Sequence, residues 1–233
     1  MLELRFIIYL GAFILLNTQQ ETPILEAYED KVLQVKIAPD SAILSIINPY
    51  KKGIDSVMNE ILCYSNITMS KNKPEGLLGN FVTDLCLEMF SEKADICVMN
   101  NGGLRTEIPN GNITRGKIYE LMPFDNELVI ITLNKKEQKE LFQYIISRKG
   151  EPFSGMKINV DKLGNININI NNIHSDIRVL TSDYLANGGD NMTFFKNKKQ
   201  NKVGLKVRDA IINYCISKDT ITSKIDNRIE YEK

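Results

Sequence analysis

Apolar residues recur every three or four positions in several parts of the chain, and this spacing predicts amphipathic helices. The pattern covers residues 74–90, 134–148 and 203–217. In the second of these ranges, Asn134 is followed three residues later by Glu137, the capping-box pattern of a helix N-terminus. An apolar stripe of this width needs a surface to cover, so we expect these helices to pack on a sheet.

Short apolar runs between the predicted helices indicate the strands of that sheet. They are residues 94–99, 127–133 and 177–181. Close alternation over residues 156–170, centred on Gly164, predicts a hairpin. A strand followed by a helix is typical of α/β organisation.

The part of the chain before residue 70 is less regular. Residues 31–37 alternate, and residues 43–47 gather isoleucine and leucine beyond Pro39 and Asp40, which predicts two strands joined by a turn. Helical spacing over residues 49–64 predicts a helix.

The first twenty residues have the layout of a secretory signal. Arg5 precedes an unbroken apolar run over residues 6–16, and a polar stretch follows. Eleven residues rise only about 17 Å as a helix, well short of the ~30 Å hydrocarbon core. We therefore expect export to the periplasm or the extracellular space and no stable membrane span, with a buried N-terminal helix or strand as the alternative.

We expect a signal segment over residues 1–20, an N-terminal extension packing on the domain over 21–70, the main domain over 71–218 and a polar tail over 219–233.

Lys plus Arg and Asp plus Glu both number 29 in the 233 residues. This balance gives no long-range attraction for nucleic acid. The four cysteines form no C-x-x-C pair, and Cys86, Cys97 and Cys215 have the apolar neighbours of core residues. A disulfide is possible after export, but the sequence does not pair the cysteines.

Two predicted strands lead directly into paired glycines. Gly102–Gly103 is followed by Arg105, and Gly188–Gly189 is followed by Asp190. Paired glycines let the backbone turn sharply and approach a ligand, although a tight turn capped by asparagine is the simpler alternative. Arginine suits phosphate or ribose oxygens and aspartate suits paired hydroxyls. A surface salt bridge between Arg105 and Asp190 is the alternative.

Two aromatic residues accompany these loops. Phe124 follows Pro123, and Tyr184 precedes the second glycine pair. Rings from separate loops could sandwich a base, because stacking accepts any base and contributes about 1–3 kcal/mol per base. The alternative is that Phe124 belongs to the core and that Tyr184 anchors its loop.

These features occur in one order, over residues 75–84, 94–105, 123–126 and 181–190. With its NGG-x-R loop, its PF-x-N segment and its LANGGD segment, the ordered set resembles the C-terminal domain of the 5′-nucleotidase family over roughly residues 70–200. The resemblance implies an α+β fold with α/β/β/α layers. It also implies a domain that holds a nucleoside and rotates to present its phosphate to a separate two-metal domain.

The resemblance further implies that Phe124 and Tyr184 clamp the base and that Asn100 bonds the base edge. It also implies that Arg105 reaches the phosphate or ribose and that Asp190 binds the ribose hydroxyls. The expected substrate-binding residues are Asn100, Gly102, Gly103, Arg105, Phe124, Asn126, Tyr184, Asn187, Gly188, Gly189 and Asp190.

The chain departs from the family pattern in three places. Lys71 and Lys73 stand where family members usually have a phosphate-holding arginine, and lysine lacks its bidentate geometry. Tyr184 replaces the commoner phenylalanine, and Asn191–Met192 replaces the usual Gly-Phe.

Metal-ligating residues are scarce, because the chain contains one histidine, His174. Two-metal hydrolysis needs several His, Asp and Asn ligands. Ser175 and Asp176 adjoin His174, and adjacent residues on a strand point to opposite faces, so they do not form a triad. We therefore expect no catalytic residue, metal or other cofactor on this chain, and divalent metals on a partner metallophosphatase.

Two functions fit these observations. In the first, the chain binds a nucleotide or nucleoside and docks on a separate metallophosphatase chain, which predicts an exposed apolar or charged docking face. In the second, the chain is a stand-alone nucleoside or nucleotide binder. A third possibility, an independent hydrolase using Asp183, Asp190 and His174, has the least support.

Overall fold

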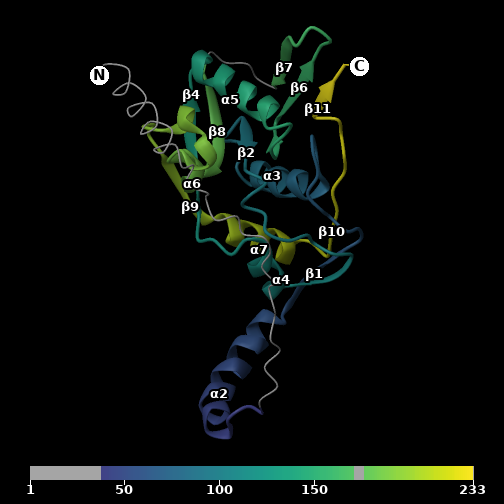
Figure 1. Ribbon diagram of the computed structural model, residues 1–233, viewed down its shortest axis with the longest axis vertical. Helices are drawn as coiled ribbons and strands as arrows, with labels where there is room; N and C mark the ends of the chain where they lie inside the picture. The colour runs from purple at the N-terminus through teal and green to yellow at the C-terminus, as the bar shows by residue number, and fades with distance from the viewer. Residues whose placement is uncertain (1–37, 171–175, 233) are drawn as a thin grey trace, which may run out of the picture. The chain divides into compact units, whose positions relative to one another are not determined.

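The computed structural model describes residues 38–170 and 176–232 (Figure 1). The chain divides into two units after Leu44, and the first is described only from residue 38. The predicted signal, the strand expected over residues 31–37, and His174 with Ser175 lie outside the described residues. Among the helices that are described, none combines the length and hydrophobicity needed to span a bilayer.

Six α-helices and three sheets make up the described chain. The helices are α2 (Ser41–Met58), α3 (Leu77–Met89), α4 (Arg115–Leu121), α5 (Lys135–Ser147), α6 (Asp183–Ala186) and α7 (Val207–Ser217). The strands are β1 (Ile61–Ser65), β2 (Ile96–Val98), β3 (Gly111–Thr114), β4 (Glu127–Leu133), β5 (Phe153–Ser154), β6 (Met156–Val160), β7 (Ile166–Ile170), β8 (Ile177–Ser182), β9 (Asn201–Lys206), β10 (Thr220–Ile221) and β11 (Ile229–Tyr231).

The largest sheet has five strands in the order β5-β2-β8-β4-β9. Its β2 and β8 strands are parallel, and every other neighbouring pair in it is antiparallel. Two three-stranded sheets, ordered β10-β1-β3 and β11-β6-β7, complete the structure. Figure 1 shows β2 and β8 side by side in the centre of the domain.

Both faces of the five-stranded sheet are buried. Leu128 and Ile130 of β4 belong to one apolar cluster with residues of α3 and α7. Val129 and Ile131 of the same strand belong to a second cluster with residues of α5 and the β6–β7 hairpin. A strand covered on both sides has no polar face, and this is why residues 127–133 form an apolar run without alternation.

The predicted helices over residues 74–90 and 134–148 are confirmed as α3 and α5. The capping box of α5 is present, because the Asn134 side chain accepts N–H bonds from Lys136 and Glu137 while Glu137 Oε2 accepts from the Asn134 N–H at 2.9 Å. The hairpin predicted about Gly164 is confirmed as β6 and β7.

The prediction of a strand over residues 43–47 was wrong, because these residues lie in α2. The helix is capped by Asp40, whose Oδ1 accepts from the N–H groups of Ala42 and Ile43 at 2.8 and 3.2 Å. Isoleucine and leucine gather here because several apolar residues share one helical stripe.

The predicted helices over residues 49–64 and 203–217 also have the wrong limits. The first ends at Met58, and Ile61–Ser65 forms β1. The second begins only at Val207, because the preceding β9 pairs with β4. Gly204 in β9 has φ +75°, which an α-helix does not accommodate.

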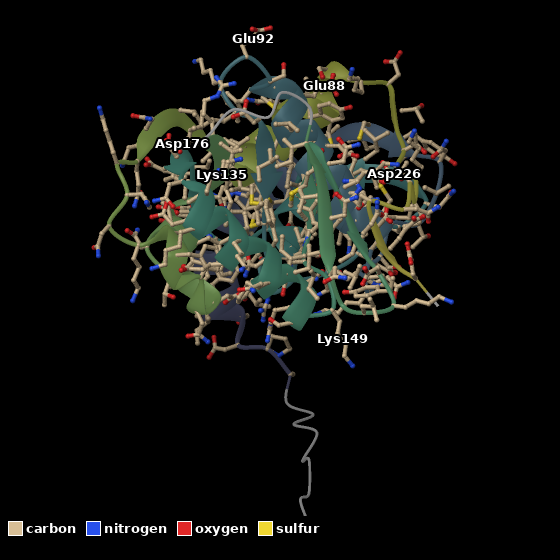
Figure 2. The ribbon with its side chains drawn as sticks, turned by 90° about the horizontal axis from the view of Figure 1, so that it is seen from above. Glu88, Glu92, Lys135, Lys149, Asp176 and Asp226 are labelled. Atoms are coloured by element: carbon tan, nitrogen blue, oxygen red, sulfur yellow. The ribbon has the colours of Figure 1, made fainter. Side chains whose placement is uncertain are left out.

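The segment after α7 is not a simple polar tail. Its β10 strand pairs with β1, and its β11 strand pairs with β6. Figure 2 shows that Glu88, Glu92 and Lys149 lie around the outside of the domain. In contrast to these charged residues, Arg228 has a side chain that is only 7% exposed. Arg228 ties this segment to the core.

Arg228 satisfies several acceptors at once. Its Nη1 donates to Asp84 Oδ1 at 2.9 Å and to the Phe153 carbonyl at 2.7 Å. Its Nε lies 2.9 Å from Asp226 Oδ1 and 3.6 Å from Glu75 Oε1, and the Glu75 side chain is 5% exposed.

We predict that Arg228→Met lowers the free energy of unfolding by about 3 kcal/mol, because it leaves the buried Glu75 carboxylate without its cation. Urea denaturation measures this change. Lys136→Ala is the control, since it removes an exposed pair to Glu140 (4.0 Å) and should change stability by less than about 0.5 kcal/mol. Equal effects of the two variants would contradict the structural role of Arg228.

Candidate functional site

The two glycine loops meet because β2 and β8 are neighbouring parallel strands. Ile96 pairs with Val179 and Cys97 pairs with Leu180. The Thr181 hydroxyl also donates to the Val98 carbonyl at 2.8 Å. Parallel neighbours have their carboxyl ends at the same edge of the sheet, the edge at which open α/β sheets bind ligands.

A cavity of about 310 Å³ lies between these strand ends. Its size is at the lower end of the range for small-molecule pockets, about 300–1,000 Å³. We call it the site cavity, and it is lined by Asn100, Gly102, Gly103, Arg105, Phe124, Asn126, Tyr184 and Asp190. All eight residues were expected from the sequence.

Three other expected residues, Asn187, Gly188 and Gly189, belong to the same loop as Asp190 but do not line the site cavity. The Asn187 side chain points to a different partner, because its Oδ1 accepts from Gln200 Nε2 at 3.0 Å. Gly188 has φ +88°, a left-handed conformation that favours glycine.

The glycines make room for side chains of their own loops. A Cβ on Gly189 would lie 2.4 Å from Tyr184 Cε1, and a Cβ on Gly103 would lie 2.8 Å from Asn100 Oδ1. The sequence suggested that these glycines admit a ligand. The structure gives a more direct reason for glycine at these positions, because Tyr184 and Asn100 pack directly against the glycine backbone.

Asp190 is bonded across the two loops. Its Oδ1 accepts from the Tyr184 hydroxyl at 2.8 Å, and its Oδ2 accepts from Asn100 Nδ2 at 2.6 Å. The alternative of a salt bridge between Arg105 and Asp190 is wrong, because no ion pair in the described part of the chain joins them. Arg105 instead donates from Nη1 to the Gly102 carbonyl at 3.3 Å.

The two aromatic side chains are half-exposed at the site cavity. Phe124 is 41% exposed, so it is not a core residue, and Tyr184 is 45% exposed. Arg105 Cζ lies 6.0 Å from the centroid of the Phe124 ring, at the limit of a cation–π contact. Tyr184 does anchor its loop, as the alternative held, but it does so through its hydroxyl while its ring remains accessible.

Arg208 supports the turn that carries Phe124. It is buried, and its Nη1 lies 3.4 Å from the Phe124 carbonyl. Arg208 also pairs with Asp125, as does Lys206 at 3.0 Å. Lys206 and Arg208 together lower the pKa of Asp125.

Sequence reasoning missed two residues that hold the glycine loops. The Tyr144 hydroxyl donates to the Asp190 carbonyl at 2.8 Å, and buried Glu151 accepts from the Asn101 N–H at 2.8 Å. Burial and the charge of Glu151 raise the pKa of Tyr144. Neither residue lies in a recognisable motif, and both act on backbone atoms distant in the sequence, so the sequence carried no signal for them.

The description "5′-nucleotidase, C-terminal domain" belongs to a family model that matches residues 56–197 of this chain. The chain is a member of that family. An apyrase from Tabanus yao is 26% identical over 225 residues, covering 80% of this chain and 41% of the relative. A 5′-nucleotidase from Vibrio parahaemolyticus is 26% identical over 172 residues, covering 68% of this chain and 30% of the relative.

A solved structure has the same fold as this 5′-nucleotidase C-terminal domain. The 5′-nucleotidase precursor from Thermus thermophilus superimposes with a TM-score of 0.70 at 23% identity, over 84% of this chain and 44% of that one. The expected layered α+β fold is therefore confirmed. The domain spans less than half the length of these relatives.

The residues that the structure describes offer no group suited to a two-metal centre. Over residues 38–170 and 176–232, no group of three or more His, Cys, Asp or Glu side chains could hold a metal ion. The four cysteines are buried and form no disulfide, and their burial confirms the core role expected of Cys86, Cys97 and Cys215.

We predict that Gly189→Ala lowers the free energy of unfolding by about 1–3 kcal/mol, because the new methyl group overlaps the Tyr184 ring. Gly189 does not have a positive φ, so the loss would report crowding and not backbone strain. Denaturant unfolding measures it. The control is Gly53→Ala in α2, where nothing lies within 4 Å of the new Cβ, and this change should be neutral or stabilising. A Gly189→Ala variant as stable as the control would show that Tyr184 does not need this space.

Proposed function

We propose that this chain is the nucleotide- or nucleoside-binding subunit of a 5′-nucleotidase-type phosphoester hydrolase acting in nucleotide catabolism, with catalysis supplied by a separate two-metal phosphatase chain. The site cavity carries the proposal. Two half-exposed rings, an arginine and a fixed carboxylate converge there from three loops. The relatives named as 5′-nucleotidases support a nucleotide as the ligand.

The chemistry of the site cavity suits the parts of a nucleotide. Phe124 and Tyr184 suit a base, because stacking needs accessible rings and both side chains are half-exposed. Arg105 offers a planar set of N–H donors to phosphate or ribose oxygens. Asp190 accepts hydrogen bonds from ribose hydroxyls.

The expected role of Asn100 changes in this proposal. Its side chain is largely buried, and its amide nitrogen is engaged by Asp190 at 2.6 Å. Asn126 also lines the site cavity, is partly exposed and follows Phe124 by two residues. We therefore assign the bond to the base edge to Asn126, and we assign Asn100 to the support of Asp190.

A separate catalytic chain requires a docking face, and α2 offers one. Its stripe, formed by Ile47, Tyr50, Ile54 and Val57, has the spacing of helix-packing residues. These side chains are 48–73% exposed, and no residue of α2 is buried. Exposed apolar patches are typical of interaction sites.

The alternative function, a stand-alone nucleoside or nucleotide binder, uses the same cavity but needs no docking face. An independent hydrolase has less support, because the carboxylates considered for it are already engaged. Asp183 Oδ1 accepts from the N–H groups of Glu127 and Tyr184, and Asp190 is bonded through both oxygens.

We predict that Phe124→Ala weakens adenosine binding by about 5- to 150-fold, the equivalent of ~1–3 kcal/mol of stacking. Isothermal titration calorimetry measures this change. The matched control is Tyr231→Ala on β11, since Tyr231 is also 41% exposed but does not line the site cavity. Unchanged affinity in Phe124→Ala would remove the stacking clamp.

We predict that the purified chain alone releases no phosphate from AMP, and that it raises chelator-sensitive release by a co-expressed metallophosphatase. The double variant Ile47→Ser/Ile54→Ser should lose this effect while keeping adenosine affinity. Lys52→Ser, on the opposite side of α2, is the control. Chelator-sensitive release by the chain alone would overturn the proposal, whereas adenosine binding without any effect on a partner would favour the stand-alone binder.

A further inference from the structure

Asp190 is fixed by its neighbours to an unusual degree. Besides the two bonds to its carboxylate, its backbone N–H donates to the Tyr184 hydroxyl at 3.3 Å and its carbonyl accepts from the Tyr144 hydroxyl at 2.8 Å. All four of its polar atoms are therefore hydrogen-bonded. The partners come from three separate parts of the fold, namely α5, α6 and the loop after β2.

The backbone of Asp190 needs this support. Its φ is +50° and that of Asn191 is +64°, so two consecutive residues with side chains adopt the left-handed region. This conformation costs an L-residue about 1–2 kcal/mol and persists where surrounding contacts fix it. Tyr144 and Tyr184 supply those contacts on the carbonyl side and on the N–H side.

The carboxylate keeps capacity for a ligand after these bonds are made. A carboxylate has about four acceptor positions, and Tyr184 and Asn100 occupy one position on each oxygen. The two that remain match the two O–H donors of a vicinal diol. A doubly ionised phosphate has no such donors, and its charge has the same sign as that of Asp190.

We propose that the hydroxyls of Tyr144 and Tyr184 are positioning groups that hold the Asp190 carboxylate toward a ribose diol, so that the site prefers ribonucleosides to analogues lacking the 2′- and 3′-hydroxyls. The inference rests on the proposed function. Tyr144 does not line the site cavity, so it acts only through Asp190. Tyr184 acts through Asp190 with its hydroxyl and on the base with its ring.

Both tyrosines remain donors at neutral pH. Burial raises the pKa of Tyr144, and the hydrogen bond to Asp190 raises the pKa of Tyr184. Replacement by phenylalanine deletes only the hydroxyl. It keeps the edge-to-face contact of residue 144 with Phe194, at a centroid distance of 5.7 Å, and the ring that residue 184 offers to the base.

The test compares the affinities of adenosine and 2′,3′-dideoxyadenosine by calorimetry. The wild-type protein should prefer adenosine by about tenfold or more, because a hydrogen bond to a charged acceptor is lost with the diol. Tyr144→Phe and Tyr184→Phe should each reduce this preference by about threefold or more. The affinity for the dideoxy analogue should change less than about twofold, since it does not use Asp190.

Tyr214→Phe is the matched control, because Tyr214 is partly buried, its hydroxyl donates to Glu88 at 3.3 Å, and neither residue lines the site cavity. Equal losses for both ligands, or no loss in either tyrosine variant, would overturn the inference. A wild-type protein that binds both ligands equally would do the same while leaving the proposed function intact. If the wild-type protein bound neither ligand, the proposed function would fail and this inference with it.

Discussion

The parallel pairing of β2 with β8 is the constraint on which the site depends. It sets the two glycine loops at one edge of the sheet, so that Asn100 and Asp190, ninety residues apart, form a hydrogen bond of 2.6 Å. The antiparallel β4 adds the third segment, because Leu128 near its start pairs with Ser182 at the end of β8. Phe124, just before β4, therefore reaches the same edge. The pairing of these three strands brings the loops around the site cavity together, and the loops contribute the side chains that line it.

The elements that the sequence predicted well are those whose pattern is local. The spacing of apolar residues in α3 and the capping box of α5 depend on residues within a few positions of one another. The strands β1 and β9 were missed because each exists through pairing with a distant strand. For α2 the error was one of period, because Ile43, Leu44, Ile46 and Ile47 belong to a helical stripe, whereas the prediction placed them in a strand.

The residues of the site also differ in how well the sequence could predict them. Its lining residues could be predicted because they stand in short motifs, in which residue type and spacing carry the chemistry. The residues that hold those motifs in place could not be predicted. Tyr144 and Glu151 act on a backbone carbonyl and a backbone N–H of remote loops, and any residue type has those groups. The sequence singled out the glycines because they let the backbone approach a ligand. The structure requires them because Tyr184 and Asn100 pack against them.

The way in which Asp190 is held decides what kind of site this is. A salt bridge to Arg105 would have fixed both side chains, but it would also have neutralised the two charges and used the donors and acceptors that a ligand needs. Asp190 is bonded instead by the neutral donors Tyr184 and Asn100, which fix its position without cancelling its charge. Arg105 lines the same cavity and keeps its own charge, because it donates to the Gly102 carbonyl and not to Asp190. A cavity with a fixed anion and a separate cation is polarised, and that polarity matches a ligand whose hydroxyls and phosphate lie at different positions.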